Sequence, residues 1–213
     1  MVRTGQFNFP LMQDIIPEGE LGNARVEHFT ISKEEAHLYS VRAIWNRDYM
    51  GRYVEAGDYC RLRVGEALMT SDCGGERWSA LDIVREAHGK VLIAGLGIGM
   101  ILCRILPKPE VEEVTVVEIS QDIIDLVEKP LREYLGKDAD KLEVVLQDIY
   151  EFKPEHKYNT IFFDIWGDYS GDTYEDTKKL HRKFQRCLDR SDSPWMESWM
   201  RWHMKELHFG DRY

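Results

Sequence analysis

The segment KVLIAGLGIG, residues 90–99, decides how the rest of this chain is interpreted. Its first part, Val91 to Ala94, is a short apolar run without polar alternation, which is typical of a parallel β-strand covered on both faces. Three glycines then alternate with apolar residues, at Gly95, Gly97 and Gly99. Glycine permits a sharp backbone turn and a close approach of the main chain to a ligand. The segment therefore predicts a buried strand followed by a ligand-binding loop.

The same alternation of apolar runs and amphipathic stretches recurs downstream. Further strands are expected at 114–118, 142–146 and 159–163. Helices are expected at 99–106, from Ser120 onward and from Asp172 onward. We expect Pro130 to disturb the far end of the helix that begins at Ser120. Strands that alternate with helices in this way predict an α/β fold with a doubly wound, Rossmann-like parallel sheet.

Three of the expected strands end in a carboxylate. Glu118 ends the second strand, 23 residues after Gly95, while Asp148 and Asp164 follow the third and fourth strands. In an open α/β sheet, ligands bind outside the carboxyl ends of the strands. A carboxylate placed like Glu118 can accept hydrogen bonds from both ribose hydroxyls. The glycine loop and the three acids together predict a site for a nucleoside-containing cofactor.

The spacing of the glycines distinguishes between cofactors. Dinucleotide binding favours G-x-G-x-x-G, whose last glycine is replaced here by Met100. The G-x-G-x-G spacing, the acid Glu118 and the pair Gln147-Asp148 resemble the class I S-adenosylmethionine-dependent methyltransferases, over residues 90–165. The resemblance implies S-adenosyl-L-methionine as cofactor. By this resemblance, the methionine and ribose part of the cofactor contacts Gly95, Gly97 and Gly99, and the ribose hydroxyls bind to Glu118. The resemblance also implies that the adenine contacts Asp148 and Ile149, and that Asp164 lies under the sulfonium.

Within that superfamily the chain is similar to the spermidine-synthase-like branch, because Gly57 to Gly65 and Thr70-Ser71-Asp72 resemble the small N-terminal β-module of those enzymes. Two positions depart from that branch. Its members have an acid in the glycine loop, which holds the ammonium of decarboxylated S-adenosylmethionine, whereas this chain has Ile98. The acid that follows the fourth strand, Asp168, stands one place late and lacks the usual proline. Both departures favour S-adenosylmethionine itself, and hence methyl transfer.

Methyl transfer requires in-line positioning, and an amine acceptor also requires a base for its proton. We assign this catalytic role to Asp164 and Asp168, with Trp166 and Tyr169 as aromatic walls that stack on a cation. The alternative is that Asp164 only orients the cofactor and that Asp168 caps the next loop.

Three functions remain open at this point. The first is methyl transfer to a small, amine-type acceptor. The second is aminopropyl transfer as in spermidine synthase. The third is non-catalytic binding of S-adenosylmethionine. The short C-terminal part suggests it, because the last two strands of the usual methyltransferase sheet do not fit into the residues after Asp164. A truncated sheet of this kind predicts an acceptor pocket completed by the N-terminal module and by a second subunit, and thus a homodimer. The tryptophan-rich segment 194–204 fits a strand and a helix equally well.

Residues 1–88 are predicted to form a separate module, and residues 89–213 the cofactor-binding domain. In the module, an irregular lead-in precedes a helix that Ser32 and Glu35 cap, with an apolar stripe of Leu38, Val41, Ile44 and Trp45. A β-meander is expected over 53–70, and a second short helix capped by Ser79 and Asp82. The module could serve as a structural cap or as a substrate lid.

The composition excludes several classes of protein. The chain has 28 Lys+Arg against 38 Asp+Glu, a net charge of −10, and no basic stretch, which argues against a nucleic-acid partner. The longest uncharged apolar run, Val91 to Cys103, is shorter than the roughly 20 residues of a membrane helix, and the N-terminus lacks a secretory signal. The four cysteines and seven histidines show no metal-ligand spacing, so we expect no metal. A cytoplasmic protein with a small-molecule substrate is the expectation.

Overall fold

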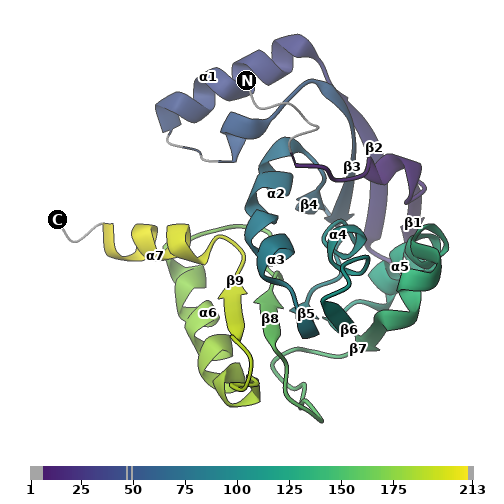
Figure 1. Cartoon of the computed structure of the whole chain (residues 1–213). Helices are drawn as coiled ribbons and strands as arrows, with labels where there is room; N and C mark the ends of the chain where they lie inside the picture. The colour runs from purple at the N-terminus through teal and green to yellow at the C-terminus, as the bar shows by residue number, and fades with distance from the viewer. Residues whose placement is uncertain (1–6, 47, 49, 211–213) are drawn as a thin grey trace.

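A computed structural model describes residues 7–46, 48 and 50–210 of the chain, which form two β-sheets. One is antiparallel with the strand order β1-β2-β3-β4, and the other is parallel with the order β7-β6-β5-β8-β9. In Figure 1 the antiparallel strands and helix α1 lie at the top and the parallel strands below. The predicted α/β fold, a Rossmann-like parallel sheet with an N-terminal β-module, is confirmed.

The parallel sheet consists of β5 (Gly89–Ala94), β6 (Val111–Glu118), β7 (Leu142–Leu146), β8 (Thr160–Phe163) and β9 (Trp195–Ser198). Strand β5 lies at its centre, with β6 on one side and β8 on the other. Alternate side chains of β5 enter two different hydrophobic clusters: Val91 and Ile93 pack with α4 (Leu102–Ile105) and α5 (Gln121–Leu135), and Leu92 and Ala94 pack with α6 (Gly171–Phe184). The sheet is thus covered on both faces, as its uninterrupted apolar runs require.

The C-terminal segment resolves into a strand and a helix. Trp195–Ser198 forms β9, which pairs in parallel with β8, and Arg201–Gly210 forms α7 after a turn at Met200. The sheet therefore contains the fifth strand that the sequence left open. Between α6 and β9 the chain makes a short turn, η5 (Gln185–Cys187).

Local signals define the starts of the long helices. The hydroxyl of Ser120 accepts a hydrogen bond from the amide of Ile123, as predicted, and Ser170 does the same for Thr173. The expectation that Pro130 disturbs the far end of α5 was wrong, because the helix continues through it to Leu135 and is followed by η4 (Gly136–Lys141). The buried apolar stripe of this helix packs on the sheet and compensates for the one backbone hydrogen bond that proline lacks.

The N-terminal module contains a strand, β1, within the lead-in that was expected to be irregular. It comprises β1 (Gly19–Leu21), β2 (Ala24–Ile31), β3 (Gly57–Val64) and β4 (Ala67–Ser71), preceded by the turn η2 (Met12–Asp14). Strand β2 pairs with β3 over eight residues. Conversely, the strand expected from Tyr53 is the 3₁₀ turn η3 (Gly51–Tyr53). Only the β3–β4 hairpin, which turns at Gly65-Glu66, was anticipated correctly.

Helix α1 (Lys33–Asn46) begins with the predicted capping box, in which the Ser32 amide donates to Glu35 and the Glu35 amide donates to the Ser32 hydroxyl. The apolar stripe of this helix lies on its exposed face. The residues that face the protein are Ala36 and Ala43, whereas Leu38, Val41, Ile44 and Trp45 are exposed.

Two short helices, α2 (Gly74–Ser79) and α3 (Leu81–Glu86), connect the module to β5. The predicted cap at Ser79 was wrong, because Ser79 ends α2 and its hydroxyl donates to the Glu76 carbonyl. The predicted boundary between residues 88 and 89 stays a prediction. A single hydrophobic cluster contains Met12 and Leu62 from the module together with Ile93 and Val116 from the parallel sheet. Among the described residues, no helix has the length and hydrophobicity needed to cross a membrane.

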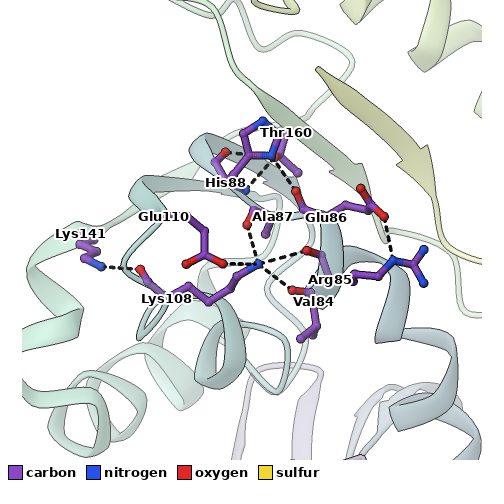
Figure 2. A network of polar contacts seen from close by, with 9 residues as sticks. All are labelled: Val84, Arg85, Glu86, Ala87, His88, Lys108, Glu110, Lys141 and Thr160. Carbon is purple, nitrogen blue, oxygen red and sulfur yellow. Dashed lines mark hydrogen bonds and ion pairs between the residues drawn. The ribbon is translucent and has the colours of Figure 1, made fainter. Parts of the chain in front are cut away.

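Lys108 binds the C-terminal end of α3 at the amino edge of the parallel sheet (Figure 2). Its ammonium donates to the carbonyls of Val84, Arg85 and Ala87 at 2.9, 3.2 and 2.6 Å. A cation is favourable at this end of a helix because the last carbonyls have no partner within the helix. Beside it, the Thr160 hydroxyl accepts from the amide of His88, which connects β8 to the end of α3.

We expect Lys108→Met to lower the free energy of unfolding by about 1–3 kcal/mol, because three carbonyls, two of them in part-buried hydrogen bonds, lose a charged donor. Urea denaturation measures this loss, with the exposed Lys137→Met as the matched control. Equal unfolding free energies for the two variants would contradict this role of Lys108.

Candidate functional site

A cavity of about 400 Å³ opens at the carboxyl ends of the parallel strands. The turn after β5 and the ends of β6, β7 and β8 form one side of it, and residues of β3, β4 and α2 form the other. Every residue predicted to bind the cofactor lines this cavity: Gly95, Gly97, Gly99, Glu118, Asp148, Ile149 and Asp164. The structure therefore brings these seven residues together, while their roles stay predictions.

The glycine loop depends on a backbone conformation that other residues rarely adopt. Gly95 has a φ of +96°, and Gly97 a φ of +54°. A Cβ atom on Gly95 would lie 2.2 Å from the carbonyl oxygen of Asp164. The loop and the end of β8 are thus in direct main-chain contact, and the amide of Asp164 donates to the Ala94 carbonyl at 2.9 Å.

The carboxylate of Glu118 is held rigidly at the cavity. Its two oxygens accept hydrogen bonds from the amides of Leu96 at 2.8 Å and Ser120 at 2.9 Å, and the residue is 6% exposed. Each carboxylate oxygen has a further lone pair. Glu118 can therefore accept two more hydrogen bonds, such as those of a vicinal diol.

Asp148 and Ile149 follow β7 in a tight turn. The Asp148 carboxylate accepts from the amide of Tyr150 at 2.8 Å, and its carbonyl accepts from Glu151 and Phe152. Ile149 is buried. A flat ring inserted here would meet an apolar surface on Ile149 and a hydrogen-bond acceptor on Asp148.

Asp164 faces a second carboxylate that sequence reasoning missed, that of Glu76 on α2. Burial raises the pKa of the Asp164 carboxyl to about 7. Burial also raises the pKa of the Glu76 carboxyl to about 8, and the nearby charge of Asp164 adds to that rise. No local sequence signal marks Glu76, because tertiary packing alone brings α2 to the edge of the sheet.

Asp168 lies outside the lining of the cavity. It is exposed, and the Thr173 hydroxyl donates to it at 3.4 Å, close to the start of α6. This position fits the alternative that Asp168 caps the following loop, although its catalytic role stays a prediction.

Of the two expected aromatic walls, Trp166 lines the cavity. Tyr169 packs against the ring of Trp199, 5.7 Å away, and its hydroxyl lies 3.4 Å from Asp48.

The N-terminal module supplies the wall opposite the glycine loop. Leu62 and Val64 of β3, Met69 and Thr70 of β4, and Glu76 of α2 line the cavity. The module is thus part of the site in this conformation, which both the cap and the lid interpretations allow. Among the residues that the structure describes, no group of three His, Cys, Asp or Glu side chains is arranged to hold a metal.

Comparison with known proteins relates this chain to polyamine synthases. Residues 82–181 match the model of the spermine/spermidine synthase domain. Polyamine aminopropyltransferase 2 of Hyperthermus butylicus is 25% identical over 170 residues, which cover 74% of this chain and 55% of that protein. The chain thus spans about half the length of this curated relative. The predicted resemblance to the spermidine-synthase-like branch is confirmed by the match.

Solved structures with a similar arrangement include spermidine synthase from Thermotoga maritima, with a TM-score of 0.47 and 18% identity over 81% of this chain and 53% of that one. They also include the glycopeptide N-methyltransferase MtfA complexed with S-adenosyl-L-methionine, with a TM-score of 0.41 and 22% identity over 53% of this chain and 45% of that one.

We expect Glu76→Gln to stabilise the protein at alkaline pH. The folded pKa of Glu76 lies above that of an unfolded glutamate, so the wild type loses stability as the pH rises from about 4.5 through about 8. Glutamine does not titrate. The variant should match the wild type below about pH 4 and exceed it by roughly 1–3 kcal/mol at pH 9.

Urea denaturation at a series of pH values measures this difference, and Glu112→Gln, at an exposed position of β6, is the control. A constant offset between wild type and Glu76→Gln across the series would show that Glu76 is not buried as a neutral acid.

Proposed function

We propose that this protein binds S-adenosyl-L-methionine and transfers its methyl group to a small amine acceptor. The observation that supports this most directly is the cavity in which the glycine loop, Glu118, Asp148 and Asp164 converge. S-Adenosylmethionine supplies a methyl group that its sulfonium has already activated. The protein then has to bind and orient the cofactor and the acceptor, exclude water, and supply a base for the acceptor's proton.

The donor set of the cavity fits the parts of such a nucleoside. Glu118 has free lone pairs for the two ribose hydroxyls, and its orientation is fixed by two amides. Asp148 would accept from the exocyclic amine of adenine, whose ring would rest on Ile149. The open backbone at Gly97 would accommodate the methionine part, with Asp164 next to the reacting sulfur.

Methyl transfer is favoured over aminopropyl transfer by the residue between the second and third glycines. Ile98 is 2% exposed and packs in the core while it also lines the cavity. An apolar side chain at this point neither pairs with the lone ammonium of decarboxylated S-adenosylmethionine nor repels the carboxylate of the intact cofactor. Aminopropyl transfer remains the second candidate, because the matched domain is named for spermine and spermidine synthases and the curated relative is named a polyamine aminopropyltransferase.

Non-catalytic binding of the cofactor is a third candidate. The pair of carboxylates at the cavity argues against it, because a cofactor with a sulfonium and an amino group does not by itself require two half-buried acids. A base for an acceptor amine accounts for them. The acceptor must be small, because it shares one cavity of about 400 Å³ with the cofactor.

Titration calorimetry with S-adenosylmethionine and with its decarboxylated form tests the proposal. We expect the wild type to bind the intact cofactor, and Ile98→Asp to shift the ratio of the two affinities at least tenfold towards the decarboxylated form. The reason is that a buried carboxylate attracts an unaccompanied ammonium and repels a carboxylate at the same distance.

Ile98→Asn is the control, since it has the size of aspartate without its charge and should leave the ratio near that of the wild type. Binding of the decarboxylated form alone by the wild type would replace methyl transfer with aminopropyl transfer. Failure of both nucleosides to bind would remove the proposed function altogether. Release of methyl-labelled product from a panel of amines then separates catalysis from binding alone.

A further inference from the structure

Two carboxylates from distant parts of the chain line the cavity, close enough for the charge of Asp164 to contribute to the raised pKa of Glu76. Glu76 comes from α2, in the segment that joins the N-terminal module to β5, and Asp164 follows β8. The surrounding lining is apolar and aromatic, with Phe162, Trp166 and Trp199 among its members. Isolated buried charges are unfavourable in such surroundings unless a counter-charge is present.

The described residues provide no counter-charge to either carboxylate. Within the described part of the chain, neither carboxylate has a hydrogen bond or an ion pair. The guanidinium of Arg77, the next residue after Glu76, is directed to Asp72 at 3.0 Å and is buried there. Among the described residues, the titratable groups whose pKa is coupled to the charge of Glu76 are Asp164, the Cys73 thiol and the Tyr169 hydroxyl, and the pKa values of all three are raised. All three are acids, so none of them supplies a positive charge.

The position of Glu76 is fixed rather than accidental. Its helix is tied to β3 through the Arg77–Asp72 pair, and Asp72 also accepts from the amide of Cys60 at 2.7 Å. At the other end of α2, the indole of Trp199 donates to the Ser79 hydroxyl at 3.0 Å, which connects the helix to the end of β9. Glu76 is thus held against the sheet edge from both sides.

From this geometry we propose that Glu76 is the base of the reaction, and that the acceptor's ammonium nitrogen binds between the Glu76 and Asp164 carboxylates. This inference rests on the proposed function and extends it by a catalytic residue and by the charge state of the substrate. Glu76 would then fulfil the role that sequence reasoning gave to Asp168, which is exposed and outside the cavity lining.

The step balances without a further reactant. The ammonium gives one proton to the ionised Glu76 and becomes a neutral amine, still hydrogen-bonded to Asp164. Its lone pair forms the new C–N bond while the C–S bond breaks, and the electron pair of that bond goes to sulfur, which becomes a neutral thioether. The product is an N-methylammonium ion, and Glu76 releases its proton to water when the product leaves.

The raised pKa values of the pair support this role, since a carboxylic acid that titrates near 8 accepts a proton from an ammonium more readily than an exposed one does. A cation binds best when both carboxylates are ionised. Its affinity should therefore increase as the pH rises through about 7 to about 8.

Binding of a probe amine tests the proposal without knowledge of the natural acceptor. We would titrate n-butylamine, a cation over this pH range, into the full chain with S-adenosylhomocysteine present, and follow the probe by NMR between pH 6 and 9. 1-Pentanol is the uncharged probe of similar shape. We expect Glu76→Gln to weaken butylammonium binding at least fivefold at pH 8.5 and to remove most of the increase with pH, while pentanol binding and nucleoside binding stay unchanged.

Two further variants sharpen the result. Glu112→Gln removes the same charge from an exposed position of β6 and should leave the probe's affinity at the wild-type value. Glu76→Asp keeps the charge one methylene further back. It should restore part of the butylammonium affinity and part of its pH dependence. If the role of Glu76 were purely structural, this variant would restore neither.

Equal butylammonium affinities for the wild type and Glu76→Gln at pH 8.5 would overturn the proposal. The nucleoside arm keeps this outcome separate from the proposed function. If S-adenosylhomocysteine fails to bind the wild type, the proposed function fails, and the amine titration without nucleoside still decides whether Glu76 and Asp164 hold a cation.

Discussion

The site depends on one buried carboxylate that is not part of it. Asp72 is inaccessible to solvent and accepts hydrogen bonds from three separate segments: the amide of Met12, the amide of Cys60 and the guanidinium of Arg77. Removing two charges from water costs several kcal/mol per ion, and the pair recovers this only with good geometry. We therefore interpret the Asp72–Arg77 pair as a positioning device. It fixes the side of α2 that carries Arg77, and the side that carries Glu76 then faces the cavity.

The half of the cavity that the strand ends form was predictable because of a general property of parallel sheets. The carboxyl ends of neighbouring parallel strands meet at one edge, so residues that follow 94, 118, 146 and 163 must converge. No knowledge of side-chain packing is needed for that inference. All seven residues predicted to bind a cofactor, which span 95–164 in the sequence, line the cavity, and their roles stay predictions.

The other half was not predictable in this way, because it depends on packing between segments that have no fixed relation in the sequence. Glu76 reaches the cavity through contacts with β3 and β9, and neither is adjacent to α2 in the chain. The outward face of α1 is a second example. A stripe at helical spacing predicts an inward face, yet the small residues Ala36 and Ala43 allow a closer approach to the module. Strand β2 is different, since its apolar alternation from Ala24 to Ile31 was readable and was overlooked.

The contact between Gly95 and the carbonyl of Asp164 has a consequence for how such a protein diversifies. Because no side chain separates the two segments, the glycine loop and the main chain at Asp164 form one closely packed unit. The opposite wall includes side chains of β4, such as Met69 and Thr70, in addition to Glu76 of α2. Under the proposed function, new acceptor preferences arise by exchange of side chains such as Met69 and Thr70, while Glu76 and the unit that binds the shared donor are inherited intact.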